Sequence, residues 1–577
     1  MYSTSSNSTI DGSLTPESEQ PRLEETPTGV SAGRDVIVND KNEPSFLNLP
    51  DLTQSMIMRY LGFREIAALA KVCKYLHGLV KKDKALERAW YRRFPSTHQY
   101  QLKTIFTSKD DQQLRDWLSP FANSGTVESF VKKRDNAYFP ALILFTKSKL
   151  MSQCETLSLE TKTEITHLKG IYIATLSADS CHLVTVSRDK TVNICDQEAD
   201  GSWKVKATIN NNALVQSASF SSDGHSLLIA GGDSIKTTKI YGQKDDGSWK
   251  VKTTIAHDEM VKSATFTADG RLSVTAASGI LKIYGQETDG SWEKKATIKH
   301  NALIRYASLS PDGRHALIFS FGKTAKIYSE EEDGSWEVKA NITHEGGILS
   351  ATFDANSHHL VTTSEDRKAK IYNLQDDGSW QKAAVISHRD FVYSANFSLD
   401  GSHVVTESED GTAKIYSLQD SGSWLIKAAI PHEVAITSAN FSANARHVVT
   451  ASHDGTANIY GRNGEGLWVK KKTIVHNDRV HSATFSPDGC LVVTASYDKT
   501  AKIVGLVANG SWVEKATIQH NSAVVLATFS ADGRYALTVS ADMKVRITEL
   551  RKGGTMDDRM SIKPSKSREP LEALLQK

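Results

Sequence analysis

The feature that most constrains the fold is a tryptophan tag that returns at an almost constant interval. The tag reads GSW, once GLW, and its tryptophans run from Trp203 to Trp512, 44 residues apart from Trp292 onward. Self-similarity at such a period indicates stacked supersecondary units, each too small to bury its apolar face alone. More than half of the chain is therefore predicted to form one continuous repeat array.

One unit, residues 378–417, shows what each repeat contains. It reads GSWQKAAVISHRDFVYSANFSLDGSHVVTESEDGTAKIYS and holds four short runs, WQKAAVI, FVYSANF, HVVTES and TAKIY. The runs are rich in Val, Ile, Thr and aromatic residues and too short for helices, and SHRD, SLDG and EDG between them have turn chemistry. Four antiparallel strands per unit predict the blade of a β-propeller.

The order of these residues resembles the WD40 family: a histidine, a V-x-S-A-x-F strand, an SPDG-type turn, an S-x-D corner and T-x-K-I followed by an aromatic residue. FSPDG itself stands at 485–489, and tyrosine replaces the family's strand-ending tryptophan. Eight histidines from His167 to His520 share one position, with Asn211 in the second unit, and aspartate follows twenty-two residues later in seven units. Gly279 and Gly322 interrupt the aspartate series. The resemblance implies an all-β WD40 propeller in which His, Ser and Asp form a hydrogen-bond network within each blade.

Counting the histidine positions gives nine units, which predicts nine blades, with eight as the alternative. The run LETKTEITH, residues 159–167, resembles the later KATIKH segments but lacks the tryptophan. In WD40 rings the strand before the histidine belongs to the preceding blade. We therefore expect this run to complete the last blade and close the ring, which removes exposed β edges.

The recurring Ser, His and Asp do not predict an enzyme. A catalytic site is singular, whereas this constellation returns around the ring as a structural element does. The five cysteines, Cys73, Cys154, Cys181, Cys195 and Cys490, are scattered and nowhere spaced as CxxC, so neither a disulfide framework nor a zinc site is expected. We predict no catalytic residue, no metal and no cofactor.

The repeats differ most in the loop between the histidine and the next strand. In a WD40 ring these loops share one face around the central channel, so their side chains are predicted to form a target-binding surface. Arginine and aromatic residues commonly anchor protein interfaces, and the cations here suit an acidic or phosphorylated peptide. The alternative is drift between duplicated units. The candidates are Lys262, Arg305, Arg389, Phe391, Tyr393, Arg479 and His481.

Residues 44–94 carry apolar residues at helical spacing and predict three short amphipathic helices with an apolar stripe left for a partner. LPDL, MIMRYL, IAALAKVCKYLHGL and AWYRRF, in this order, resemble an F-box. That resemblance implies docking on the Skp-family adaptor of cullin-RING (SCF) ubiquitin ligases. A helical cap packed on the propeller is the alternative. The adaptor-binding candidates are Leu49, Pro50, Leu52, Ile57, Tyr60 and Leu61.

The remaining stretches complete the organisation. Residues 1–43 are rich in Ser, Thr and Glu and predict a disordered arm. Residues 95–157 predict a helical connector, 158–550 the propeller, and 551–577 a polar basic tail. The net charge of +2 gives no reason to expect nucleic acid or a membrane as partner, and the N-terminus lacks a secretory signal.

Together these features predict a non-catalytic substrate receptor of an SCF-type ubiquitin ligase. The F-box would bind the Skp-family adaptor, and through it the cullin, while the propeller would hold a protein target. The alternative is a WD40 scaffold with no ubiquitination role. A cytoplasmic location is expected, with the nucleus as a second possibility. The near-identity of the repeats also suggests a bacterial effector acting in the host cytosol.

Overall fold

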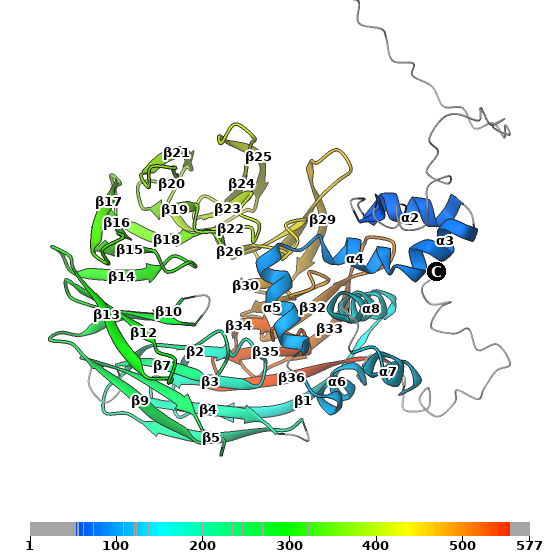
Figure 1. The fold of residues 1–577 in the computed structure, drawn as a ribbon, viewed down its shortest axis with the longest axis horizontal. Coiled ribbons are helices and arrows are strands. Elements are labelled where there is room, and N and C mark those ends of the chain that lie inside the picture. Colours follow the sequence, from blue (N-terminus) through cyan, green and yellow to red (C-terminus); the bar gives the residue numbers. More distant parts are fainter. Residues whose placement is uncertain are drawn as a thin grey trace, which may run out of the picture. The chain divides into compact units, whose positions relative to one another are not determined.

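The computed structural model describes two regular parts, a group of helices and a closed array of β-sheets (Figure 1). Residues 55–577 form one unit by their contacts, and the predicted arm at 1–43 lies outside the described residues. The structure describes residues 54, 57–59, 61, 63–72, 74–107, 109–120, 122, 124–134, 139–198, 201–231, 236–244, 246–267, 270–320 and 322–553.

The described helices precede the sheets. They pack around buried aromatic side chains, with Phe106 and Trp117 in edge-to-face contact at 4.7 Å between ring centroids. Helix α6 begins with a capping box, in which Asp110 and Gln113 each accept the other's backbone N–H, so two otherwise unpaired donors are satisfied. The helices are α2 (Phe63–Val72), α3 (Lys74–Lys82), α4 (Ala85–Tyr91), α5 (Ser96–Thr107), α6 (Asp111–Leu118), α7 (Ser124–Val131) and α8 (Phe139–Gln153).

The strands form nine antiparallel four-stranded sheets within the described residues, which confirms nine blades and excludes the eight-bladed alternative. Blades 1 to 8 each use four consecutive strands, beginning with β2–β5. The first strands of neighbouring blades contact one another and surround the centre of the ring. These are β2 (Ile171–Leu176), β6 (Val215–Phe220), β10 (Val261–Phe266), β14 (Ile304–Leu309), β18 (Ile348–Phe353), β22 (Val392–Phe397), β26 (Ile436–Phe441), β30 (Val480–Phe485) and β34 (Val524–Phe529).

The second and third strands form the interior of each blade. The second strands are almost entirely buried because both of their faces are covered by neighbouring blades, which explains their continuous apolar runs. They are β3 (His182–Ser187), β7 (Ser226–Gly231), β11 (Leu272–Ala277), β15 (His315–Ser320), β19 (His359–Ser364), β23 (His403–Ser408), β27 (His447–Ser452), β31 (Leu491–Ser496) and β35 (Tyr535–Ser540). The third strands are β4 (Thr191–Gln197), β8 (Thr237–Gln243), β12 (Ile280–Gln286), β16 (Thr324–Glu330), β20 (Lys368–Leu374), β24 (Thr412–Leu418), β28 (Thr456–Arg462), β32 (Thr500–Leu506) and β36 (Lys544–Lys552).

The fourth strand of each blade forms its outer edge and begins, in blades 1 to 8, at the repeat tryptophan. Each of these strands carries a β-bulge whose extra residue is lysine in all but blade 5, where it is Ala383. Bulges and lysines discourage pairing with foreign strands. The fourth strands are β5 (Trp203–Asn210), β9 (Trp249–Ala256), β13 (Trp292–Lys299), β17 (Trp336–Thr343), β21 (Trp380–Ser387), β25 (Trp424–Pro431), β29 (Trp468–Val475), β33 (Trp512–Gln519) and β1 (Leu157–Thr166).

The ring closes through the first strand of the chain. Strand β1 pairs antiparallel with β36, from Leu157 opposite Lys552 to Thr166 opposite Lys544, and the ninth sheet has the order β1-β36-β35-β34. The prediction that residues 159–167 complete the last blade is therefore confirmed. The strands extend from Leu157 to Lys552, and the remainder of the predicted tail beyond residue 553 lies outside the described residues.

Candidate functional site

The repeated histidine anchors a hydrogen-bond network inside the blade. In blade 5, Nδ1 of His344 lies 2.8 Å from Oδ2 of Asp366, and Nε2 lies 2.9 Å from Oγ1 of Thr362. Because an ionised carboxylate only accepts, Nδ1 carries the proton and Nε2 accepts from the threonine hydroxyl. The same histidine–aspartate contact, at 2.8 to 3.3 Å, joins His167 to Asp189, His388 to Asp410, His432 to Asp454 and His476 to Asp498.

The predicted partnership of His and Asp is confirmed in five blades. It is absent in blade 9, where Nδ1 of His520 and Oδ2 of Asp542 have no hydrogen-bond partner among the described residues. Asp233 lies outside the part of the chain that the structure describes.

The predicted role of serine needs correction. Ser364 accepts the backbone N–H of Asp366 at 3.0 Å, so it orders the turn. The hydroxyl on Nε2 belongs to a threonine eighteen residues after the histidine, which sequence reasoning missed although it recurs in phase. In blade 4, where Gly322 replaces aspartate, His300 instead contacts Ser320 at 2.9 Å and the Tyr328 hydroxyl at 3.2 Å.

Burial sets the charge state of this network. It lowers the pKa of His344 below its usual value of 6.5. Burial alone would raise the pKa of Asp498, but hydrogen bonds led by that of the Thr500 hydroxyl lower it to about 2. The network thus pairs a neutral imidazole with a carboxylate in a buried, recurring position, which suits a structural role. The described residues contain no group of three or more His, Cys, Asp or Glu side chains arranged to hold a metal.

The repeat tryptophans also have a structural role. Trp424, in blade 6, packs edge-on against His359 of blade 5, with ring centroids 5.4 Å apart, and against Phe397 at 6.0 Å. At the closure, Trp203 of blade 1 meets Tyr535 of blade 9 at 5.8 Å. The same edge-to-face contact between consecutive blades joins His182 to Trp249, His315 to Trp380, His403 to Trp468 and His447 to Trp512.

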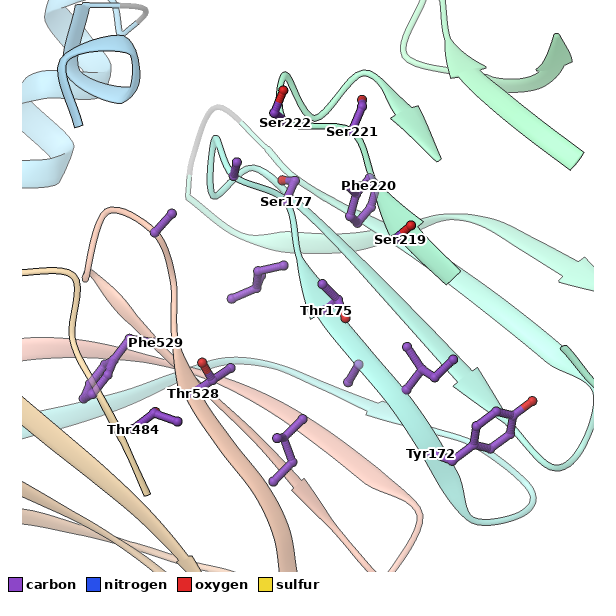
Figure 2. A pocket seen from close by; sticks show the side chains of 16 residues that line it. Tyr172, Thr175, Ser177, Ser219, Phe220, Ser221, Ser222, Thr484, Thr528 and Phe529 are labelled. Atoms are coloured by element: carbon purple, nitrogen blue, oxygen red, sulfur yellow. The ribbon is translucent and has the colours of Figure 1, made fainter. Parts of the chain in front are cut away.

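Residues of the first strands of four blades, and of the turns that follow three of them, line an open cavity of about 670 Å³ (Figure 2). Its walls come from blades 1, 2, 8 and 9 and carry small apolar and hydroxyl side chains, including Thr175, Ser219, Thr484 and Thr528. Polar side chains at the equivalent position join neighbouring blades, since Asn396 donates to Ala439 O at 3.0 Å. The described residues of this wall include no Asp, Glu, His, Lys, Arg or Cys side chain.

The structure brings the predicted target-binding residues to one end of the first strands. Lys262, Arg305, Tyr393 and His481 are the second residues of β10, β14, β22 and β30, whereas Arg389, Phe391 and Arg479 lie in the turns just before β22 and β30. All seven are thus at the start of strands that run in the same sense around the ring. We call these seven residues the loop face.

Blades 6 and 8 contribute the aromatic part of the loop face. Phe391 and Tyr393 are each 41% exposed, and His481 stacks on Tyr497 with ring centroids 5.9 Å apart. A hydrogen bond to Glu409 raises the pKa of Tyr393 to about 12. Arg305 reaches the next blade and donates to Ile348 O at 3.2 Å, so this cation also supports the contact between blades 4 and 5.

The helices leave apolar side chains exposed. Val72 on α2 is 65% exposed and Tyr75 on α3 is 44% exposed, whereas Ile66 and Leu76 are buried between the helices. Of the predicted adaptor-binding residues, Ile57 and Leu61 are half-buried, and Leu49, Pro50, Leu52 and Tyr60 lie outside the described residues. Exposed apolar side chains of this kind typically mark a contact surface.

Helices α5 to α8 fix the helical domain to the propeller. The buried Lys147 on α8 donates to Asp532 O at 3.1 Å and to Gly533 O at 2.9 Å. Trp117 Nε1 donates to Asp532 O, and His98 contacts Pro487 O at 2.9 Å. These carbonyls belong to the turns between the first and second strands of blades 8 and 9, so two consecutive blades hold the connector.

Comparisons with known families agree with this division. The "WD domain, G-beta repeat" family matches residues 336–373, 380–417, 425–461 and 468–504, and the "F-box domain" family matches residues 46–88. The chain carries an F-box and WD40 repeats. The F-box match covers helices α2 and α3 and the first part of α4, and the WD40 matches fall in blades 4 to 8, while the sheet topology extends the same unit to all nine blades.

Solved structures similar to this F-box and WD40 chain include two of Sqt1 from Chaetomium thermophilum. The one bound to the N-terminus of the ribosomal protein L10 is 17% identical with a TM-score of 0.43, and the alignment covers 56% of this chain and 94% of that chain. The other is 16% identical with a TM-score of 0.45, covering 60% and 97%. The C-terminal WD40 domain of Sif2 is 13% identical with a TM-score of 0.46, covering 68% and 98%. No curated protein matches the chain.

Among the described helices, none combines the length and apolar character that a membrane-spanning segment requires. The described cysteines, Cys154, Cys181, Cys195 and Cys490, are all free thiols.

Proposed function

We propose that this F-box and WD40 protein is the substrate receptor of an SCF-type ubiquitin ligase. The F-box match at residues 46–88 is the observation that carries the proposal. Its helices would bind the Skp-family adaptor, and the adaptor would connect them to a cullin. The loop face of the propeller would bind a protein target, and the chain itself would perform no chemistry. Cytoplasm is the compartment in which we expect this, with the nucleus as a second site.

The contacts between connector and propeller support this division of labour. Lys147, Trp117 and His98 attach the connector to buried backbone carbonyls of blades 8 and 9, and helix α4 packs against α8. A fixed connection between two binding surfaces holds a bound target near the attached ligase components. The effective concentration of the target, rather than any catalytic residue, would then accelerate its modification.

Capture of the adaptor tests the first half of the proposal. The full-length chain should retain the Skp-family adaptor and cullin, and the variant Leu49→Ala with Leu61→Ala should lose both. A second variant, Val72→Glu with Tyr75→Glu, changes exposed positions and should have the same effect. The matched control is Leu425→Glu with Ile426→Glu on β25, where two apolar side chains are each 51% exposed. Failure of the unmodified chain to retain the adaptor would leave the alternative, a WD40 interaction scaffold.

Proximity labelling tests the second half. Targets labelled by the full-length chain should disappear with Phe391→Ala and Tyr393→Ala, whereas the F-box variant should keep labelling them. The same experiment in host cells would address the proposal that the chain is a bacterial effector. If both variants label the same proteins as the unmodified chain, the loop face is not the target-binding surface.

A further inference from the structure

The positive charge of this chain is concentrated in one region. Residues 59–103 carry eleven Lys or Arg against three Asp or Glu, a net charge of +8, although the whole chain has +2. The rest of the chain is therefore net negative. Nothing in the packing of an apolar adaptor-binding face requires such an excess, because like charges on a small domain repel one another and weaken the folded state.

Four of these cations line a single cavity of about 330 Å³. Its walls come from Arg59 before α2, from α4 and the residue after it, from α5 and from the start of α8. None of the described residues that line it is acidic. Burial, together with the neighbouring charge of Arg88, lowers the pKa of Arg92. The lining residues are Arg59, Arg88, Tyr91, Arg92, Lys103, Pro140 and Ala141.

Hydrogen bonds hold one of these cations, Arg92, and the neighbouring Tyr91 in place before any ligand binds. The Arg92 guanidinium donates to Arg59 O and, at 2.8 Å, to Leu61 O. The Tyr91 hydroxyl donates to Gln99 O at 2.6 Å. Ordered donors lose little conformational freedom on binding, which strengthens the binding of an anion. Guanidinium groups in particular match the geometry of phosphate oxygens.

The charge of the cavity indicates how many phosphates it would take. Asp83 lies 3.9 Å from Arg88 and Glu87 interacts electrostatically with the same arginine, so Arg88 is offset and the three cations Arg59, Arg92 and Lys103 remain. A single phosphoryl group carries about −1.5 to −2 at neutral pH, so two or more groups are needed to balance the site. Pro140, Ala141 and the Tyr91 ring add an apolar wall.

We propose that this cavity binds a compact soluble polyphosphate, a small molecule with at least two phosphate groups. The site lies between the F-box helices and the connector, so its ligand would join two parts of the chain and stabilise their contact. Binding would therefore raise the thermal stability of the whole helical domain. This inference is independent of which adaptor or target the chain uses.

Calorimetric titration of the full-length chain with pyrophosphate, tripolyphosphate and inorganic phosphate, at constant ionic strength, tests the proposal. We expect one site per chain and binding of pyrophosphate at least about tenfold tighter than inorganic phosphate. Arg59→Gln with Lys103→Gln changes two exposed side chains and should weaken pyrophosphate at least about tenfold. The control, Lys71→Gln with Lys74→Gln, removes two exposed lysines outside the cavity and should leave the affinity unchanged.

A second measurement uses the unmodified protein. Tripolyphosphate should protect Lys103 from chemical acetylation, detected by mass spectrometry, while Lys71 and Lys74 react at unchanged rates. Equal protection of all three lysines, or equal loss of affinity in both double variants, would show only diffuse attraction and overturn the proposal. Binding of a doubly phosphorylated peptide with no binding of pyrophosphate would also overturn it, in favour of a phosphoprotein partner. Adaptor capture by the Arg59→Gln and Lys103→Gln variant is measured in parallel. If this variant loses pyrophosphate binding but still captures the adaptor, the phosphate site is separate from the proposed ligase role.

Discussion

Trp424 of blade 6 packs perpendicular to His359 of blade 5, with ring centroids 5.4 Å apart and an interplanar angle of 86°. The contact crosses from one blade to the next, and similar pairs recur around the ring. The repeated tryptophan of the sequence therefore lies at contacts between neighbouring blades. Its regular return reflects the packing of blades on one another and implies no repeated ligand site.

Replacing Trp424 by alanine should destabilise the ring by about 3–5 kcal/mol, since it removes a buried aromatic side chain from a packed joint. Thermal unfolding of the full-length chain measures the effect. Trp336 of blade 4 is the control. In that blade Leu309 stands where blade 6 has Phe397, and the Trp336 side chain is only partly buried. An equal loss of stability in Trp424→Ala and Trp336→Ala would show that the edge-to-face ring contacts contribute nothing beyond the surface area that they bury.

Acid should weaken the propeller through its buried histidines. Burial lowers the pKa of His257, His447 and His520 to about 4, helped by the nearby cations Lys282, Arg93 and Arg546 respectively. The folded values lie below the unfolded value of 6.5, so the unfolded chain binds more protons between these limits. The contribution to stability is complete above about pH 6.5 and is lost as the pH falls towards 4.

Measuring unfolding free energy between pH 7 and 4.5 checks this prediction. His520→Asn, the residue found at this position in blade 2 as Asn211, should reduce the slope by up to about 1.4 kcal/mol per pH unit. His225→Asn, at an exposed histidine outside the blade network, is the matched control for the loss of a histidine side chain. An unaltered slope in the His520 variant would mean that this group is not protonated on unfolding.

The sequence predicted most of the fold because the repeat supplies its own comparison. Nine histidine positions in phase gave nine blades, and the similarity of residues 159–167 to later units predicted the closing strand. The threonine partner recurs for seven of the eight histidines, with His300 as the exception, and the same comparison of repeats would have predicted it. Contacts made once, such as Lys147 with the turn of blade 9, have no repeat signal, because they join residues hundreds of positions apart.

The loop face could be predicted from the repeats, whereas the cavity lined by Arg88 and Arg92 could not. Comparison of the repeats with one another predicts Lys262 and Tyr393. The structure places both at the second position of their strands, β10 and β22. Arg59 and Lys103 lie outside the repeats, so no internal comparison was possible. Only folding brings these two side chains to one cavity.

A cluster of charged side chains lies where the closing strand β1 pairs with β36. Glu549 on β36 is fully buried, and it contacts Arg534 at 2.6 Å, Arg551 at 2.7 Å and Lys162 of β1 at 3.0 Å. Lys162 is the bulge residue of β1. Glu549→Gln should destabilise closure by about 1–3 kcal/mol, because it removes the buried carboxylate that three partly buried cations share.

Chemical denaturation of Glu549→Gln, Lys162→Met and the double variant forms a cycle that isolates their coupling. Lys295 of β13 is also a bulge residue and contacts Glu287 on an exposed edge, so Lys295→Met should have a much smaller effect than Lys162→Met. Additive effects of the Glu549 and Lys162 changes would contradict a specific closing interaction.

Lys147 is a buried cation that ties the connector to the turn of blade 9, where Lys109 also contacts the Asp532 carboxylate at 3.7 Å. Lys147 is 3% exposed, donates to two carbonyls and lies 5.3 Å from the centroid of the Trp117 ring. Lys147→Met keeps the length of the side chain but leaves the Gly533 carbonyl without its donor, whereas Asp532 O still accepts from Trp117 Nε1. One unsatisfied buried carbonyl costs about 1–3 kcal/mol. Hydrogen exchange of α8 should therefore become faster while the exchange of β18–β21, in the distant blade 5, stays unchanged. Lys132→Met, at an exposed lysine after α7, should alter neither. Faster exchange throughout the propeller would show that Lys147 supports the whole ring instead of the joint, and unchanged exchange of α8 would show that the joint does not depend on it.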